Sequence, residues 1–515
     1  MQLSERIKSI DWSSLKTILF VGLIVRLIAA IFAEGYSMHD DHFLVIEAAG
    51  SWADGFDYNN WLPWNKAAGA APEGHSFTYV GLNYLFFTCM KFFGISDPKT
   101  LMLINRIIHA LFSLLVIRFG YLITEKLSNK KTASYVGWML ALLWAMPFLS
   151  VRNLVEVVSI PFLMWAVWLT LQDNRKWALF YAGLLIGVAI SFRYQIAIYA
   201  VGLGIFYLIK LEWRKLFLMS AGSIVMFLLT QGLVDYFIWG YPFAEFKGYV
   251  VYNMNEGTRY MKNANYFMYF YVLFGFLLFP LGILALVAYF KSARKYLILF
   301  IPTFVFLLFH TIFPNRQERF ILTIFPLVVI LVFLGIEQLR VRKFWNGFWK
   351  VSWVAFWILN IPLFCIVTVM PSKKSRVNTM YALHGKVHGG EHILIEATGE
   401  TNPEMMPFFY SGKWNYKVLE RWNMDTVNPA SFYTVEPQDY IFFFGEKNLD
   451  QRIDTFKVIY PKMHLEAQIE PGFVDKFLHG INPRNSNSYV EIWKTEVKSS
   501  KGSNNVQKVP KNPIQ

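Results

Sequence analysis

The chain has 515 residues, of which 55% are hydrophobic and 18% aromatic, whereas only 16% are charged. Soluble proteins carry about 25% charged residues, so the composition excludes a disordered or collagen-like chain and argues against a soluble protein. The only cysteines, Cys89 and Cys365, exclude a disulfide scaffold. In such an apolar chain, a net charge of +14 indicates basic loops beside membrane spans. We therefore expect membrane lipids, and no nucleic acid, as partners.

Apolar runs that approach the length of a bilayer span recur from Ile18 to Met370. A helix needs about 20 apolar residues to cross the hydrocarbon core, and several of these runs are somewhat shorter. We predict eleven spans and therefore an all-α polytopic membrane protein. The predicted spans are Ile18–Ala33, Leu101–Ile123, Ala133–Leu149, Val158–Leu171, Trp177–Ser191, Ile196–Ile209, Leu216–Ile238, Phe267–Tyr289, Leu297–Phe313, Phe320–Ile336 and Val351–Met370.

A further apolar segment, Phe77–Phe93, contains Lys91 and follows a loop rich in proline and glycine. Short basic loops stay on the cytoplasmic side of a membrane. The N-terminal segment and four short loops are basic, and they share one side only if Phe77–Phe93 does not cross. We therefore predict that this helix lies along the outer surface, with the N-terminus cytoplasmic and the C-terminus extracytoplasmic, in a periplasm or lumen. The basic residues are Arg6, Lys8, Lys126, Lys130, Lys131, Lys210, Arg214, Lys215, Lys291, Arg294, Lys295, Arg340, Arg342 and Lys343.

The composition changes after Met370, so we predict a membrane domain over residues 1–370 and an extracytoplasmic domain over residues 371–497. The second part lacks long apolar runs and contains short strand-like pieces separated by turn residues, which is typical of a small α/β domain. The strand-like pieces are His392–Glu396, Tyr440–Phe444, Phe456–Tyr460 and Tyr489–Thr495. The tail, residues 498–515, is rich in Lys, Ser, Asn and Pro, and we expect it to be disordered.

Four arginines fall at the outer ends of predicted spans, where positive charge is unusual: Arg152, Arg193, Arg316 and Arg319. The planar guanidinium fork suits a phosphate group. Four such groups around one outer cavity would bind a lipid phosphate at the leaflet surface. Alternatively, each arginine pairs with a nearby glutamate or reaches lipid head groups.

The sequence Met38-His-Asp-Asp-His-Phe43 follows the first predicted span. One carboxylate there could remove a proton from an attacking hydroxyl, or bind a divalent metal with His39 or His42. In a purely structural interpretation, Ser37 and Asp40 form a helix-capping box at the start of an interfacial helix. Adjacent side chains point in different directions, so one aspartate can cap the helix while the other faces a cavity.

Weaker signals come from single polar residues near the outer side. Asp235 and Asn253 could orient a sugar hydroxyl or form local hydrogen bonds, and His310 fits a buried core histidine. We take six residues as candidates for sugar or acceptor binding: His39, His42, Glu156, Asp235, Asn253 and Glu318. The sequence contains no P-loop, GxGxxG fingerprint, HExxH motif or CxxC pair, which leaves a nucleotide-driven mechanism without support.

Together these segments resemble the GT-C glycosyltransferases, and most of all glycosyltransferase family 22. That family contains the mannosyltransferases that build lipid-linked oligosaccharides and GPI anchors. Its H-P-D-E motif is similar to His39–His42, which places the family aspartate at Asp41, although the proline and glutamate are replaced. Its H-K-E-x-R-F motif is similar to Asn315–Phe320, which keeps a basic residue, Arg319 and Phe320. The segments Asp235–Gly240 and Phe246–Asn253 resemble another family segment, and the resemblance covers about Ile18–Ile336.

The resemblance implies a GT-C fold and inverting transfer of a sugar from a polyprenyl-phosphate donor to a glycolipid or glycan hydroxyl. The sugar that the resemblance implies is mannose. The reaction would take place on the extracytoplasmic side. Asp41 would be the general base, with Asp40 as the rival, and the four arginines would stabilise the leaving phosphate. We expect no cofactor, because several arginines can balance a monophosphate; a divalent metal is the less favoured alternative.

Two other functions remain open from the residues. A metal-dependent oligosaccharyl or protein O-glycosyltransferase of related architecture would also use paired acidic residues. A polytopic lipid or solute transporter would favour inverted repeats and charges at the bilayer midplane. The sequence has no halved symmetry, and Arg26 is the main charge within a span.

Overall fold

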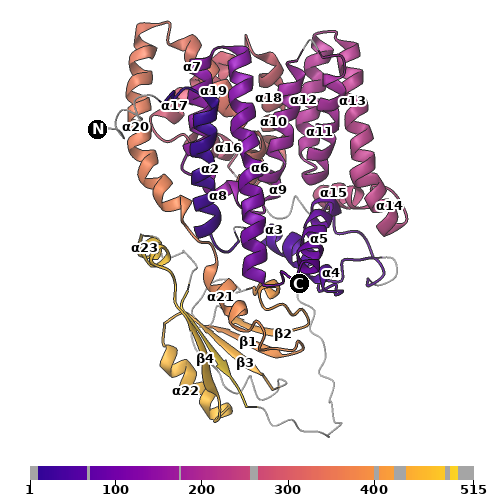
Figure 1. The fold of residues 1–515 in the computed structure, drawn as a ribbon, viewed down its shortest axis with the longest axis vertical. Coiled ribbons are helices and arrows are strands. Elements are labelled where there is room, and N and C mark those ends of the chain that lie inside the picture. The colour runs from indigo at the N-terminus through magenta and orange to yellow at the C-terminus, as the bar shows by residue number, and fades with distance from the viewer. Residues whose placement is uncertain are drawn as a thin grey trace. The chain divides into compact units, whose positions relative to one another are not determined.

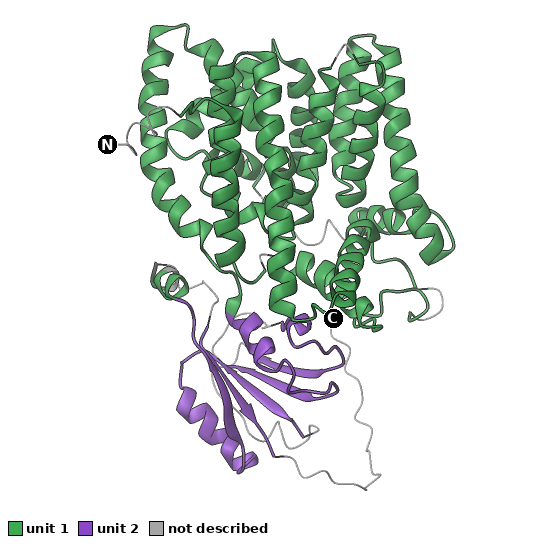
Figure 2. Cartoon of the chain, in the orientation of Figure 1, with its two compact units in different colours: residues 1–374, 473–485 green, residues 375–472, 486–515 purple. Residues whose placement is uncertain are grey.

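The computed structural model describes residues 10–36, 38–66, 70–172, 175–255, 265–398, 405–422, 437–481 and 488–496. The chain divides into two compact units (Figure 2). The first, which we call the membrane unit, contains residues 1–374 and 473–485; the second, the C-terminal unit, contains residues 375–472 and 486–515. The tail predicted to be disordered, residues 498–515, lies outside the described residues.

The membrane unit is helical, and its long helices run roughly parallel (Figure 1). Its α-helices are α2 (Leu15–Phe32), α3 (His39–Asp41), α4 (Ala48–Ala53), α5 (Phe77–Phe92), α6 (Pro98–Leu127), α7 (Lys130–Leu142), α8 (Met146–Ser150), α9 (Val155–Val158), α10 (Ile160–Thr170), α11 (Ala178–Phe192), α12 (Ile196–Ile209), α13 (Trp213–Phe227), α14 (Leu233–Trp239), α15 (Ala244–Asn255), α16 (Met268–Gly275), α17 (Leu281–Ser292), α18 (Leu297–Ile312), α19 (Phe325–Leu339), α20 (Lys343–Thr368) and α23 (Phe473–Ile481). Two π-helical segments, η1 (His42–Glu47) and η2 (Leu228–Gly232), and one 3-10 segment, η3 (Glu318–Ile324), interrupt or extend them.

All eleven predicted apolar runs are mainly helical, so the polytopic helical fold is confirmed. Two of them are broken: Ala133–Leu149 between α7 and α8, and Phe267–Tyr289 between α16 and α17. Among the described residues, five helices are long and apolar enough to cross a membrane, and a sixth results if α17 and α18, bent by 119°, form one span. Three shorter apolar helices, Val155–Thr170, Ala178–Phe192 and Ile196–Ile209, add to these. The number eleven therefore stays a prediction, as does the position of α5 on the outer surface.

Helix α19 is the centre of the membrane unit. All residues from Phe320 to Ile336 are buried, and α19 packs against α6, α7, α17, α18 and α20. A helix that is apolar on every side is stable only when neighbours surround it. The 3-10 segment η3 leads directly into α19, so a rigid helix fixes the polar residues of η3 at one end of the bundle.

Arg26, which lies within the first span, is fully buried. Its Nε donates to Ser113 Oγ at 2.9 Å, and its Nη atoms donate to the carbonyls of Leu140 at 3.0 Å and Ala141 at 3.3 Å. These carbonyls lie in the last turn of α7, where helix carbonyls lack intrahelical partners. Arg26 therefore acts as a structural cap for a broken helix, which removes the main sequence feature that favoured a transporter.

The C-terminal unit contains a five-stranded mixed sheet of order β2-β1-β3-β5-β4. β1 pairs in parallel with β2 and β3, whereas β5 is antiparallel to β3 and β4. Its elements are α21 (Lys374–Ala382), β1 (His392–Ala397), a 3-10 turn (Phe408–Tyr410), β2 (Lys417–Trp422), β3 (Tyr440–Phe444), α22 (Leu449–Ile459), β4 (His464–Ile469) and β5 (Val490–Lys494). The predicted α/β character of this part is confirmed.

One predicted strand is wrong: Phe456–Tyr460 belongs largely to helix α22. Arg452, Ile453 and Phe456 are buried at helical spacing, and Ile453 and Phe456 pack with β1 and β3 residues in one apolar cluster. The apolar run at the end of α22 is too short to show this period by itself. Strands β2 and β4 were not predicted: charged residues interrupt the apolar residues of β2, and β4 alternates apolar with polar residues over only six positions.

We predict that Arg26→Met destabilises the membrane unit without changing its exposed surface. The substitution leaves two helix-end carbonyls and Ser113 without their charged donor, and hydrogen bonds to charged groups contribute about 1.5–3 kcal/mol each. Thermal unfolding of the purified protein in detergent should show a melting temperature several degrees lower. Arg118→Met, on the exposed side of α6, is the matched control and should melt like the unmodified protein. Equal melting of both variants would contradict the capping role.

Candidate active site

The acidic motif after the first span forms two short helical turns. α3 (His39–Asp41) continues directly into the π-helical turn η1. π-helical turns occur frequently at functional sites. Asp40 is exposed, whereas Asp41 is only 5% exposed, so the two adjacent carboxylates occupy different environments. Ser37, on which the capping-box interpretation depends, lies outside the described residues.

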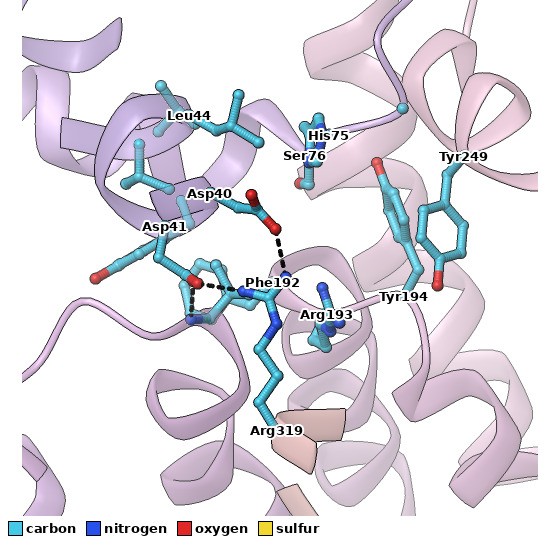
Figure 3. Close-up of a pocket in the computed structure, with 15 residues that line it drawn as sticks. Asp40, Asp41, Leu44, His75, Ser76, Phe192, Arg193, Tyr194, Tyr249 and Arg319 are labelled. Atoms are coloured by element: carbon cyan, nitrogen blue, oxygen red, sulfur yellow. Dashed lines mark hydrogen bonds and ion pairs between the residues drawn. The ribbon is translucent and has the colours of Figure 1, made fainter. Parts of the chain in front are cut away.

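Arg319 joins the two aspartates (Figure 3). Its Nη1 donates to Asp41 Oδ2 at 2.8 Å, and its Nη2 donates to Asp40 Oδ2. Its Nε donates to Gln317 Oε1 at 2.8 Å. Because η3 is anchored by the buried helix α19, this guanidinium is held in a defined position between the two carboxylates.

Glu156 organises the charges behind the aspartates. It is fully buried on α9, and its Oε1 lies 3.0 Å from Arg193 Nη2 and 3.6 Å from Arg319 Nε. The backbone N–H of Val155, the preceding residue, donates to Asp41 Oδ1 at 2.8 Å. A single helical turn therefore positions Asp41, Arg193 and Arg319 together, although these residues come from three distant parts of the chain.

A cavity of about 80 Å³ opens beside this cluster. Figure 3 shows Asp40, Asp41, Arg319 and Arg193 toward one side of it and a pair of tyrosines, Tyr194 and Tyr249, on another. The cavity is lined by Asp40, Asp41, Leu44, Val45, Gly74, His75, Ser76, Tyr79, Val80, Val155, Phe192, Arg193, Tyr194, Tyr249 and Arg319. The arrangement combines ionised groups, hydroxyls and aromatic rings, which can together bind a polar ring attached to an anionic group.

Burial raises the pKa of Asp41 to about 7, and the nearby negative charge of Glu156 acts in the same direction. Arg319, the N–H of Val155 and Arg193 lower it only in part. A carboxylate with a pKa near neutrality is a stronger base than an ordinary aspartate and still largely ionised above pH 7. Asp41 is thus suited to accept a proton.

Two of the four predicted arginines lie away from the cavity. Arg152 is 3% exposed and donates to the backbone carbonyls of Glu34, Gly35 and Met370. Arg316 donates from Nε to the carbonyl of Phe313 at 3.2 Å and lies over the ring of Tyr266, 4.1 Å from its centroid. Of the predicted phosphate-binding arginines, the structure therefore brings Arg193 and Arg319 to the aspartates.

The remaining predicted residues make local contacts. His42 is buried against Glu47, with 3.0 Å between Nε2 and Oε1, and burial lowers its pKa to about 3, so it is neutral. Asp235 Oδ2 accepts from the N–H of Glu245 at 2.9 Å, and Asn253 donates to the carbonyl of Tyr249. His39 stacks on Phe43, His310 bonds to the carbonyl of Phe306, and Glu318 is exposed. Within the described residues, none of these side chains lines the cavity.

Sequence reasoning missed one wall of the cavity, which the loop Gly74–Ser76 forms against helix α15. Glu245 Oε2 accepts from the N–H of Gly74 at 2.7 Å and of His75 at 3.1 Å. Gly74 has φ +80, and a Cβ there would approach the backbone nitrogen of Tyr249 to 2.8 Å. The turn itself is visible in the sequence as Pro72-Glu-Gly74, but nothing in the sequence connects it to a residue 171 positions away.

The carboxylates of Asp40 and Asp41 both contact the guanidinium of Arg319. Within the described residues, no group of three or more His, Cys, Asp or Glu side chains is arranged to hold a metal ion. The positive charge that faces Asp40 and Asp41 comes from Arg319 and, through Glu156, from Arg193.

The comparison with protein families decides the class of this site. The model of the Alg9-like mannosyltransferase family matches residues 17–391. The chain belongs to the Alg9-like mannosyltransferase family. It is therefore a glycosyltransferase, and the resemblance found in the sequence is confirmed. No curated protein matches the chain in sequence.

Solved structures with the same fold are GT-C enzymes. ArnT from Cupriavidus metallidurans bound to undecaprenyl phosphate is 14% identical, with a TM-score of 0.57, and the match covers 92% of this chain and 97% of that one. ArnT in the apo state is 13% identical, with a TM-score of 0.55 and the same coverage. The Archaeoglobus fulgidus oligosaccharyltransferase in complex with Zn and sulfate is 12% identical, with a TM-score of 0.51, covering 85% and 69%. These similarities establish the GT-C fold.

We predict that Asp41 titrates near pH 7 in the protein without substrate. As the pH falls through this value, infrared difference spectra should show the carbonyl stretch of a newly protonated carboxyl group, and Asp41→Asn should lack this signal. Burial also raises the pKa of Glu245 to about 7, so Glu245→Gln is the matched control and should retain the Asp41 signal. If the signal that Asp41→Asn lacks appears in the unmodified protein only at about pH 4, the ordinary range of an aspartate, the predicted environment of Asp41 is contradicted.

Proposed function

We propose that this enzyme transfers a sugar from a polyprenyl-phosphate donor to a hydroxyl group of a glycolipid or glycan. The family to which the chain belongs favours mannose as this sugar. The observation that carries the proposal is the buried carboxylate of Asp41, held 2.8 Å from Arg319 beside a cavity. A base and a phosphate-binding cation are the two groups that inverting transfer from a sugar phosphate requires.

Asp41 acts as the general base. The acceptor hydroxyl donates its proton to a carboxylate oxygen of Asp41 while its oxygen attacks the anomeric carbon of the donor sugar. The bond between this carbon and the phosphate oxygen breaks, and the bonding electrons leave with the polyprenyl phosphate. Attack from the side opposite the leaving group inverts the anomeric carbon. The pKa of about 7 leaves Asp41 ionised above neutral pH and able to hold the proton during the reaction.

Arg319 and Arg193 stabilise the leaving phosphate. In the structure, Arg319 contacts carboxylates at both Nη atoms, so a phosphate must replace at least one of them. Asp40 is the one to leave, because its side chain is 57% exposed, whereas that of Asp41 is 5% exposed and also held by the N–H of Val155. Donor binding therefore exchanges the Asp40 carboxylate for the donor phosphate on Arg319, while Asp41 stays in place.

The reaction takes place at the extracytoplasmic face. Asp41 follows the end of α2, Arg193 follows the end of α11 and Arg319 precedes α19, so these groups gather at one end of the bundle. The loops at the opposite end of α6, α12 and α17 carry the basic residues that favour the cytoplasm. From this charge pattern we propose that the N-terminus is cytoplasmic and that the cavity is extracytoplasmic.

The similarity to ArnT, of which one structure holds undecaprenyl phosphate, supports a polyprenyl-phosphate donor. The family match supports mannose as the sugar. A glycolipid or glycan acceptor fits the wall of hydroxyl and aromatic groups formed by Ser76, Tyr79, Tyr194 and Tyr249.

The test is transfer from radiolabelled polyprenyl-phosphate mannose by the purified, reconstituted protein, with a membrane lipid extract as the acceptor. We predict that Asp41→Asn lowers the rate by about 10²–10⁴, the usual effect of losing a general base. Asp40→Asn should be milder, because Asp40 gives way to the donor phosphate. The rate of the unmodified enzyme should fall as the pH drops below about 7, because protonated Asp41 cannot accept a proton.

Near-normal turnover in Asp41→Asn would reject Asp41 as the base. An inactive Asp40→Asn together with an active Asp41→Asn would exchange the two roles. Unchanged melting temperatures in both variants ensure that the rates report on chemistry rather than on folding.

A further inference from the structure

The segment between the last membrane helix and the C-terminal unit is paired with the segment that leads into the acidic motif. Ser372 donates its N–H to the carbonyl of Glu34 at 2.9 Å, and Tyr36 donates its N–H to the carbonyl of Ser372 at 3.1 Å. Gly35 and Ser372 form a parallel β-bridge, and Lys374 Nζ lies 2.9 Å from Glu34 Oε2. We call residues 34–36 together with residues 370–374 the clamp.

Arg152 fastens both halves of the clamp. Its Nη1 donates to the carbonyl of Gly35 at 2.8 Å and more weakly to that of Glu34 at 3.3 Å, while its Nη2 donates to the carbonyl of Met370 at 3.2 Å. The guanidinium also lies over the ring of Phe148, 4.3 Å from its centroid. These contacts leave Arg152 3% exposed and direct its donors to backbone oxygen atoms, away from the reaction cavity.

Tyr36 connects the clamp to the acidic motif. Lys373 Nζ lies over its ring, 4.9 Å from the centroid, and the His42 imidazole stacks on the same ring with a centroid separation of 4.3 Å. His42 is in turn bonded to the fully buried Glu47. A displacement of residues 370–374 would therefore be passed through Tyr36 and His42 to the neighbouring Asp41.

We infer that the clamp positions Asp41 for catalysis, and that Arg152 is a positioning residue rather than a ligand of the donor phosphate. The inference rests on the proposed function and extends it to the chain segment that enters the C-terminal unit. A small chamber of about 20 Å³ supports it, because it is lined both by clamp residues (Gly35, Tyr36) and by Asp41, His42 and Arg152. The catalytic aspartate and the clamp thus share one wall.

Gly35 offers a specific way to open the clamp. It has φ +86, and a Cβ at this position would lie 1.7 Å from the carbonyl oxygen of Ser372. Gly55 has a similar φ of +74, but a Cβ there meets nothing within 4 Å. Alanine at either position meets the same left-handed backbone strain, whereas only Gly35→Ala separates the two segments of the clamp.

The experiment compares Gly35→Ala and Arg152→Ala with Gly55→Ala in the full-length, reconstituted protein. A displacement of a catalytic group by about 1 Å can cost about 10²-fold in rate. We expect a loss of this size in kcat for Gly35→Ala and Arg152→Ala, an unchanged donor KM, and a shifted pH midpoint of the rate. Gly55→Ala should behave like the unmodified enzyme, and Arg152→Lys should recover part of the rate.

A raised donor KM with unchanged kcat in Arg152→Ala would make Arg152 a phosphate ligand and overturn the inference. Normal kcat and pH midpoint in the folded fraction of Gly35→Ala would give the clamp a merely structural role. If Gly35→Ala does not fold, the double variant Lys373→Ala, Lys374→Ala loosens the clamp at partly exposed side chains, and it should show the same shift of the pH midpoint. An unshifted midpoint in that variant would also overturn the inference.

The infrared titration of Asp41 separates this inference from the proposed function, because it needs no substrate. Gly35→Ala should move the Asp41 titration, and Gly55→Ala should leave it in place. This result would support the clamp even if the unmodified protein transferred no mannose. An Asp41 titration that is identical in both variants would refute the clamp even if the transfer reaction were established.

Discussion

The bridge from Arg319 to Asp40 and Asp41 is the interaction on which the site depends. A buried carboxylate is costly unless a partner compensates its charge, and an arginine beside a membrane is costly for the same reason. In the absence of substrate, the opposite charges of the arginine and the carboxylates therefore offset part of the free-energy cost of burying each other. Glu156 adds a third carboxylate and Arg193 a second guanidinium, so three acidic groups share two arginines before the donor arrives. Donor phosphate then competes for a guanidinium that is already in place.

The packing of the membrane helices holds the charged residues of this cluster in fixed positions. Val155, Arg193 and Arg319 all lie where helices begin, end or break, at the 3-10 segment η3 that leads into the buried helix α19. Helix breaks expose backbone N–H groups, and Val155 uses one of them to hold Asp41. Packing of apolar helices thus fixes polar groups at their ends, and the low polarity of the surroundings raises the pKa of Asp41. The same principle explains Arg26 and Asn360, which cap the interruption between α7 and α8.

Much of this could be predicted from local sequence. Apolar runs predicted the helices, and short motifs around Asp41 and Arg319 predicted the family, which the family model confirms. What the sequence could not predict depends on contacts between distant residues. From its sequence position, Arg152 was predicted to bind phosphate. The local sequence does not indicate its contact with the carbonyl of Met370, which lies 218 positions away. Glu156 could be proposed as a sugar ligand but not as a support for two arginines, and Glu245 gave no signal because its partners lie in the loop at Gly74.

The central claim is that donor phosphate replaces an aspartate on Arg319. A cryo-electron microscopy structure of the reconstituted protein with polyprenyl phosphate bound tests it most directly. The account predicts that Nη2 of Arg319 binds a phosphate oxygen atom, that Asp40 is released into the cavity, and that Asp41 keeps its hydrogen bond from Val155. A structure in which Arg319 still bridges both aspartates while the phosphate binds elsewhere would contradict it.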